Sequence, residues 1–419
     1  MTPRTLAQKL VGRACGDPQV QPGDIVTCRV DLAMMHDSGG PRRLKPHLDS
    51  LGVRVWDPER IVVVTDHYVP ATDEGSAQIV RIARDWVREQ GIRHFYDEQG
   101  ICHVVTPSHG HLRPGMFAVG GDSHSCTGGA FGAYMFGIGA TEMLGVAVSG
   151  EIWLRVPHTI AMEWTGRLPS GVCAKDMMLY MCTRFGMDGG QYEAVEFCGD
   201  AVRALSMNER MTLSNMATEL GAQAGLIAPD ATTVQWLQAA GVPGDALHDM
   251  TQWCTDEGAP LLARHRMEAG SLAPQVSAPG SPAQAQDATA FAHERTGHCL
   301  HRRLHGRQAG RPAHGGSGVP WRPQGGCGRA PHGGASQRAR PAPGRRRRCT
   351  ANTGGRGRRA AAQCLRRMRG LWRQHVRTRY HRHQHHRAQL HGTHGRGLIA
   401  RVPGLALHRG GIRHHGLHH

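Results

Sequence analysis

The sequence predicts an α/β protein built on parallel sheets, and three observations support this fold class. Residues 61–65 (IVVVT) are a continuous apolar run rich in β-branched residues, typical of a buried parallel strand. Residues 75–90 repeat isoleucine, valine, alanine and tryptophan at helical spacing. Strand-like and helix-like segments then alternate to about residue 230, as they do where helices connect parallel strands.

The first elements can be placed in order along the chain. We expect a helix at 3–11, a strand at 24–30 and a turn at 32–38 that carries His36 and Asp37. The strand at 61–65 ends directly in Asp66 and His67, and the helix at 75–90 follows it. Polar residues in this position matter, because parallel sheets bind ligands at the carboxyl ends of their strands.

Later elements continue the alternation. Residues 95–96 begin another strand, and 100–105 present His103. Beyond the glycine-rich segment, the pattern predicts strands at 160–164, 193–197 and 225–229 and helices at 174–185 and 208–220.

Residues 120–143 (GGDSHSCTGGAFGAYMFGIGATEM) contain three adjacent side chains that could take part in catalysis. Asp122, Ser123 and His124 lie between a glycine pair and a run of small residues. They offer a carboxylate, a hydroxyl and an imidazole, which together can hold and protonate an oxygen-rich substrate. A glycine-rich surface loop with ordinary polar residues is the alternative.

Each of the other candidate residues also has a structural interpretation. His67 could cap a strand end, and His103 could be a hydrogen-bonded core imidazole. Glu196 lies between Val195 and Phe197, and a carboxylate inside an apolar strand needs a partner. Cys126 and His124, two residues apart, are weak evidence of a metal site. Other cysteines share no metal-ligand spacing and are expected to be ordinary thiols: Cys15, Cys28, Cys102, Cys173, Cys182, Cys198 and Cys254.

Composition divides the chain near residue 290. The net charge is +17, yet of the 33 acidic residues only Glu294 lies beyond position 290, and the last lysine is Lys175. Residues 291–419 are rich in arginine, histidine and glycine and cannot supply a packed core, so we expect this tail to be disordered. The start of the chain lacks the apolar core of a signal peptide, and no apolar run is long enough to span a membrane, which favours the cytoplasm.

Four segments follow one another in a recognisable order: TDHYVP at 65–70, GICHVV at 100–105 and the longer stretches 114–143 and 193–230. Together they resemble the aconitase superfamily, and within it the large subunit of 3-isopropylmalate dehydratase and its homoaconitase-like relatives. The resemblance covers residues 1–290. It implies an aconitase-like multi-domain architecture, with parallel sheets around a cluster cleft and domains 1 and 2 within this region.

The resemblance also implies an activity. Such enzymes are hydro-lyases that dehydrate and rehydrate hydroxy-di- or tricarboxylic acids, with a [4Fe–4S] cluster whose open iron binds the substrate hydroxyl. It implies 3-isopropylmalate/2-isopropylmalate isomerisation in leucine biosynthesis, with homoaconitate or dimethylmalate-type hydration as the alternative. A separate small, swivelling subunit would complete the site and supply the serine base.

Individual roles follow from the same resemblance. Asp66, His67 and Asp122 would surround the leaving hydroxyl, and His103 would pair with Glu196. Ser123 and His124 would line the site, with His36 nearby. His36 and Ser123 would bind substrate, and the remaining residues would be catalytic: Asp66, His67, His103, Asp122, His124 and Glu196. Cys126 would not be a cluster ligand.

The cluster cysteines of the family lie in two later loops that the tail does not show. When codons are chosen for residues 298–315 and read one base later, they can encode IAYIGACTGAKLDDLRM, which resembles the first loop. The same shift turns 364–372 into an ACGACAGY-like second loop. We therefore interpret 291–419 as the out-of-frame remnant of a third, cluster-binding domain, which as written would not bind the cluster. The alternative is an arginine-rich tail that binds nucleic acid without sequence preference.

Overall fold

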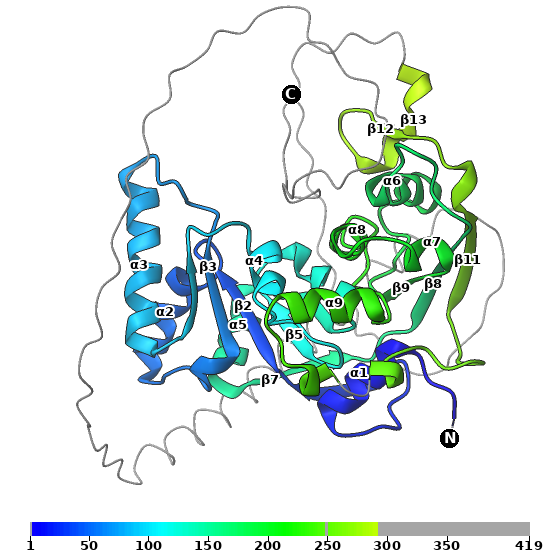
Figure 1. The fold of residues 1–419 in the computed structure, drawn as a ribbon. Helices are drawn as coiled ribbons and strands as arrows, with labels where there is room; N and C mark the ends of the chain where they lie inside the picture. Colours follow the sequence, from blue (N-terminus) through cyan, green and yellow to red (C-terminus); the bar gives the residue numbers. More distant parts are fainter. Residues whose placement is uncertain (1, 248–249, 292–419) are drawn as a thin grey trace, which may run out of the picture. The chain divides into compact units, whose positions relative to one another are not determined.

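The computed structural model describes residues 2–247 and 250–291, and within them the chain is a mixed α/β protein (Figure 1). Two parallel sheets dominate: a five-stranded sheet in the order β4-β3-β2-β5-β6 and a four-stranded sheet in the order β10-β9-β8-β11. Two antiparallel pairs, β1 with β7 and β12 with β13, complete the sheet structure of this part of the chain. The predicted α/β class with parallel sheets is confirmed.

The five-stranded sheet contains β2 (Leu32–His36), β3 (Ile61–Thr65), β4 (His94–Asp97), β5 (Phe117–Gly120) and β6 (Tyr134–Gly137), and every neighbouring pair is parallel. From β2 the chain builds outward through β3 to β4, and β5 then returns to the other side of β2. The order therefore reverses between β2 and β5. In open α/β sheets, ligands bind at such a reversal, outside the carboxyl ends of the strands.

Alternate residues of these strands face opposite layers. Val62, Val64 and Met34 join a core with helix α4 (Cys102–Ser108) and the 3₁₀ segment η2 (Ser123–Phe131). Helices α2 (Pro41–Leu51) and α3 (Glu74–Gln90) lie on the other side of the sheet in Figure 1, and α5 (Ala140–Ser149) packs beside α2. Because both faces are covered, the strands can be apolar throughout.

The four-stranded sheet has its own core. It contains β8 (Thr159–Thr165), β9 (Ala194–Cys198), β10 (Ala224–Leu226) and β11 (Ala263–Glu268). Helix α6 (Ala174–Phe185) and helix α8 (Met207–Met216) contribute methionines and leucines to this core. Helix α8 also packs against η2, so it joins the core of this sheet to the glycine-rich segment.

The remaining elements connect or cover the two sheets. They are α1 (Leu6–Cys15), α7 (Asp200–Arg203), α9 (Ala231–Ala239), β1 (Ile25–Arg29), β7 (Glu151–Arg155), β12 (Gln275–Ser277) and β13 (Ala285–Asp287). None of the helices within residues 2–247 and 250–291 has the length and apolar character that crossing a bilayer requires.

Most of the predicted elements are present, and two predictions need correction. The first helix begins at Leu6 rather than residue 3, because Thr5 and Gln8 form a capping box there. Residues 32–36 are not a turn but the central strand β2, with all five residues buried. The two polar residues at its end suggested a turn, but Leu32, Ala33, Met34 and Met35 supply an apolar strand before them. The predictions of a disordered tail and an out-of-frame third domain lie outside the described residues.

Candidate active site at the carboxyl ends of three strands

The predicted site residues from the first half of the chain meet at one edge of the five-stranded sheet. His36 is the last residue of β2, Asp66 and His67 follow β3, and Asp122 follows β5 by two residues. His103 comes from α4, which begins where Asp66 accepts a hydrogen bond from the backbone N–H of Cys102 at 2.7 Å. This edge is the one at which the strand order reverses.

His67 is held between two carboxylates. Its Nδ1 lies 2.6 Å from Oδ1 of Asp66, and its Nε2 lies 3.6 Å from Oδ2 of Asp122. The nearby carboxylate of Asp122 and the hydrogen bond to Asp66 outweigh burial and raise the pKa of His67 to about 10. The ring is therefore an imidazolium at neutral pH, and 37% of its side-chain surface is exposed.

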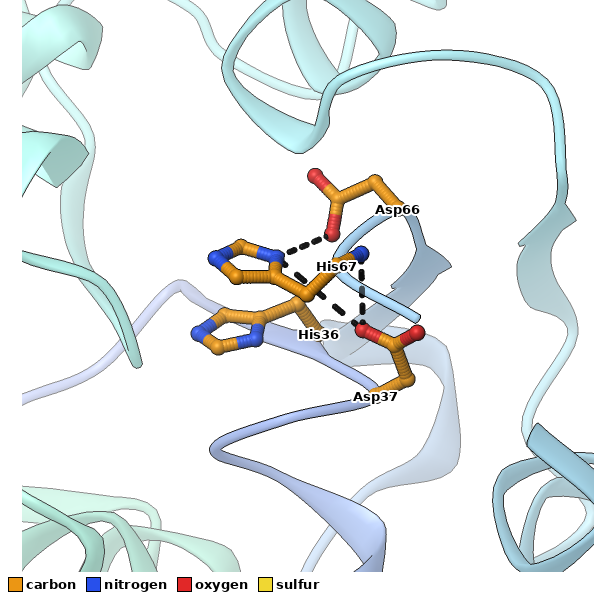
Figure 2. Close-up of side chains that lie close together, drawn as sticks. All are labelled: His36, Asp37, Asp66 and His67. Atoms are coloured by element: carbon orange, nitrogen blue, oxygen red, sulfur yellow. Dashed lines mark hydrogen bonds and ion pairs between the residues drawn. The ribbon is translucent and has the colours of Figure 1, made fainter. Parts of the chain in front are cut away.

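His36 provides a neutral ring beneath His67. The two rings stack with centroids 3.9 Å apart and an angle of 16° between their planes, as Figure 2 shows. The backbone N–H of Gly39 donates to Nδ1 of His36, so Nε2 carries the proton and donates to the carbonyl of Gly121 at 3.0 Å. Burial and the charge on His67 lower the pKa of His36. Both ring nitrogens are thus already used inside the protein.

Asp122 is the centre of the site. Its Oδ1 lies 2.8 Å from Nε2 of His103 and also accepts the backbone N–H of His124 at 2.8 Å. Burial opposes ionisation, but the hydrogen bond from His103, the hydrogen bond from the backbone of His124 and the nearby His67 ring hold the pKa of Asp122 far below its usual range. One carboxylate therefore organises three imidazoles.

His124 has a partner that the sequence analysis missed. Its Nε2 lies 3.2 Å from Oε1 of Glu219, which follows helix α8. Burial lowers the pKa of His124, but Asp122 and Glu219 more than offset it and raise the value to about 9. Ser123 is exposed, with its Oγ 3.2 Å from Nδ1 of His124. The sequence pattern that could have identified Glu219 is a lone carboxylate among small residues in ATELGAQAG, which joins two elements that pack on η2, α8 and β10.

The predicted pairing of His103 with Glu196 is wrong. His103 bonds to Asp122, whereas Glu196 lies on β9 in the other sheet and accepts a 2.5 Å hydrogen bond from the hydroxyl of Thr255. Glu196 is only 7% exposed, and burial raises its pKa. Its buried carboxyl does have a partner, as the sequence required, but that partner is structural.

The donors in this site are imidazoles and carboxylates rather than thiolates. Two groups bring possible ligand atoms together: His36, Asp37, Asp66 and His67, and His103, Asp122 and His124. In the first group these atoms already bond to one another or to backbone groups. Cys126 is buried, its thiol donates to the carbonyl of Asn215 at 3.3 Å, and burial raises its pKa to about 12. Burial also raises the pKa of Cys102 well above its usual value.

An iron–sulfur cluster requires several convergent thiolates, and the described residues place none in either of these groups. These two groups in the described part of the chain therefore offer no thiolate to such a cluster. They supply instead a charged imidazole, His67, fixed at its Nδ1 by Asp66 and facing Asp122. That arrangement suits a general acid acting on an oxygen atom of a ligand.

Comparison with known proteins gives a consistent result. Residues 8–314 match the family described as Aconitase family (aconitate hydratase). The chain is 44% identical over 282 residues to the 3-isopropylmalate dehydratase large subunit 1 of Methanopyrus kandleri, covering 67% of this chain and 66% of that protein. It is 41% identical over 284 residues to the probable methanogen homoaconitase large subunit of Methanothermobacter thermautotrophicus, covering 67% and 65%.

The similarity extends to bacterial proteins. The 3-isopropylmalate dehydratase large subunit of Aquifex aeolicus is 38% identical over 270 residues, which cover 62% of each chain. The chain thus matches just under two thirds of the length of these curated relatives.

Proposed function

Because this chain belongs to the aconitase family, we propose that it is the large-subunit part of a hydro-lyase that dehydrates and rehydrates a hydroxy-di- or tricarboxylic acid. The preferred reaction is the isomerisation of 3-isopropylmalate and 2-isopropylmalate, a step of leucine biosynthesis. Relatives named for this reaction and for homoaconitase match the chain at similar identity, so homoaconitate-type hydration is the second candidate within the same reaction class.

The observation that carries the proposal is the position of His67 between Asp66 and Asp122. In dehydration, the imidazolium donates a proton from Nε2 to the substrate hydroxyl as the C–O bond breaks, and water leaves. In hydration, the neutral ring takes a proton back from water. Asp66 fixes the ring through Nδ1, and Asp122 stabilises the charged form from the Nε2 side.

The other polar residues have supporting roles in this proposal. His103 and His124 hold the Asp122 carboxylate in place, and Glu219 orients His124. The exposed hydroxyl of Ser123 is available to a substrate oxygen. The base that removes the α-proton is expected from a small partner subunit, since two of the similar proteins are named large subunits of 3-isopropylmalate dehydratase.

Binding of the family's [4Fe–4S] cluster by this chain is considered separately from its acid–base residues. The described residues do not fit it, and the sequence supports a single-base frame slip between about residues 289 and 298 that removes the ligand loops. We propose that the chain as written binds no cluster and has lost the activity, while a chain with the frame restored recovers both.

A direct assay tests the proposal. The frame-restored chain, reconstituted with iron and sulfide and mixed with a small subunit of the family, should convert 3-isopropylmalate to its unsaturated acid, followed by ultraviolet absorbance. Homocitrate serves as the competing substrate, and the chain as written serves as the matched control. Loss of turnover with both substrates in the restored chain would overturn the hydro-lyase assignment.

A further inference from the structure

Asp37 is a fully buried carboxylate directly after β2, and its side chain bonds to backbone rather than to other side chains. Its Oδ1 accepts the N–H of Ser38 at 3.0 Å and of His67 at 3.1 Å. Its Oδ2 accepts the N–H of Tyr68 at 2.9 Å. The relative exposure of Asp37 is 0%. Both carboxylate oxygens are therefore bonded within the protein.

The backbone of the segment that Asp37 holds lies outside the sheet. Strand β3 ends at Thr65, so His67 and Tyr68 lie beyond the last residue that pairs with β4. The ring of His67 is partly exposed, so packing alone does not fix it. Hydrogen bonds from backbone N–H groups to an ionised carboxylate are about twice as strong as neutral ones, which makes Asp37 an effective anchor for this turn.

Asp37 acts on the main chain rather than on the ring of His67. Nδ1 of His67 is 3.9 Å from Oδ1 of Asp37 but 2.6 Å from Oδ1 of Asp66. Figure 2 shows Asp37 below the backbone of His67, with Asp66 beside the ring and His36 stacked against it. The backbone anchor and the stacked ring together define where Nε2 of His67 points.

We propose that Asp37 is a positioning residue for the acid of this site: it fixes the backbone at His67 and Tyr68, so that the His67 ring lies on His36 with Nδ1 at Asp66 and Nε2 toward Asp122. This inference rests on the proposed function for the role of His67 as the acid. It assigns Asp37 no contact with substrate.

The test compares three variants of the full chain as it exists. Asp37→Asn keeps the size of the side chain but replaces one acceptor oxygen with a donor that faces a backbone N–H. Asp37→Ala removes both acceptors. Asp31→Asn is the control for general loosening of the strand, because Asp31 directly precedes β2, accepts the backbone N–H of Phe117 at 2.9 Å and lies at the end of β2 away from His67. Unlike Asp37, it also pairs with Arg13 and Arg60.

Two readouts report on His67 without catalysis. Hydrogen–deuterium exchange of a peptide spanning residues 66–70 should become about tenfold or more faster in Asp37→Asn and stay unchanged in Asp31→Asn. NMR titration of labelled histidine should show the His67 pKa falling by a unit or more toward its ordinary value in Asp37→Asn, but not in Asp31→Asn.

Unchanged exchange and an unchanged His67 titration in a folded Asp37→Asn chain would overturn the inference. The same changes in Asp31→Asn would also overturn it, because the effect would then be general loosening of β2. If Asp37→Ala fails to fold, Asp37→Asn decides. Since neither readout needs turnover, a failure of the hydro-lyase assay is distinguishable from a failure of this proposal.

Discussion

Nδ1 of His67 lies 2.6 Å from Oδ1 of Asp66, so the ring is fixed by a carboxylate from the neighbouring residue. Adjacent residues seldom orient one another this way, because their side chains usually diverge along an extended chain. Here the chain has left β3 and turns, and the turn directs both side chains into the same site. The His67 pKa and the chemistry proposed for the site depend on this contact.

The first prediction concerns stability at alkaline pH. The folded pKa of His67 is about 10, above its unfolded value of about 6.5. The ion pairs of His67 therefore stabilise the fold fully below about pH 6.5, and this stabilisation is lost as pH rises through 10. Chemical denaturation should show the free energy of unfolding falling between pH 7 and pH 10. His67→Gln should flatten part of that fall, and the remainder should follow His124, whose pKa is about 9. An identical pH profile in His67→Gln would contradict the assignment.

A second prediction concerns a buried ion pair near α9. The side chain of Arg210 is fully buried and donates to both oxygens of Asp230 at 2.7 and 2.6 Å. Asp230→Ala leaves the guanidinium uncompensated and should cost about 3 kcal/mol or more in denaturant unfolding. The exposed pair Arg203–Asp200 is the control, and Asp200→Ala should cost less than about 1 kcal/mol. Equal losses in the two variants would show that burial does not determine the effect.

The third prediction concerns the close approach of η2 to β10. A Cβ atom at Gly129 would lie 1.9 Å from the carbonyl oxygen of Gly225, while the carbonyl of Gly129 accepts the N–H of Ile227 at 3.0 Å. Gly129→Ala should therefore destabilise the protein by roughly 2 kcal/mol or more, because backbone must move. Gly244→Ala meets nothing within 4 Å and should have little effect. Thermal unfolding of both variants tests this, and a stable Gly129→Ala chain would refute the packing.

A fourth prediction concerns the DNA that encodes residues 280–300. Resequencing should reveal one inserted or deleted base, after which the frame encodes CTGAK-like and ACGAC-like loops. Stop codons in the shifted phase, or the absence of such loops, would refute the frame slip.

The positions of the site residues from the first half of the chain were predictable, because these residues follow recognisable strands or lie in a glycine-rich segment. Asp66 and His67 come directly after the apolar run of β3, and Asp122 and His124 lie beside the glycines that end β5. Residue patterns predict such relations well, because the residues are neighbours in the sequence. The strand β2 was harder, since five buried residues show no alternation, and His36 and Asp37 at its end resemble turn residues.

The pairing of side chains was not predictable, because it depends on how distant elements pack. Glu196 and Glu219 both lie in the segment that resembles the family, and each is a carboxylate in apolar surroundings. Glu219 lies between α8 and β10, and the packing of both elements on η2 brings it to His124. Strand β9 instead carries Glu196 to Thr255 in the other sheet. The residue types showed that each of these two carboxylates needs a hydrogen-bonding partner, but only the tertiary structure shows which residue is that partner.

Whether His67 is the acid is tested by the turnover of His67→Ala in the frame-restored chain, assayed with a small subunit of the family. We expect a loss of about a hundredfold or more, the usual size of a lost acid–base group, with the fold intact by circular dichroism. His111→Ala is the matched control: this histidine bonds to the hydroxyl of Tyr96 rather than to the site, and its loss should leave turnover unchanged. Turnover of His67→Ala equal to that of the unsubstituted enzyme would contradict the claim that His67 is the acid.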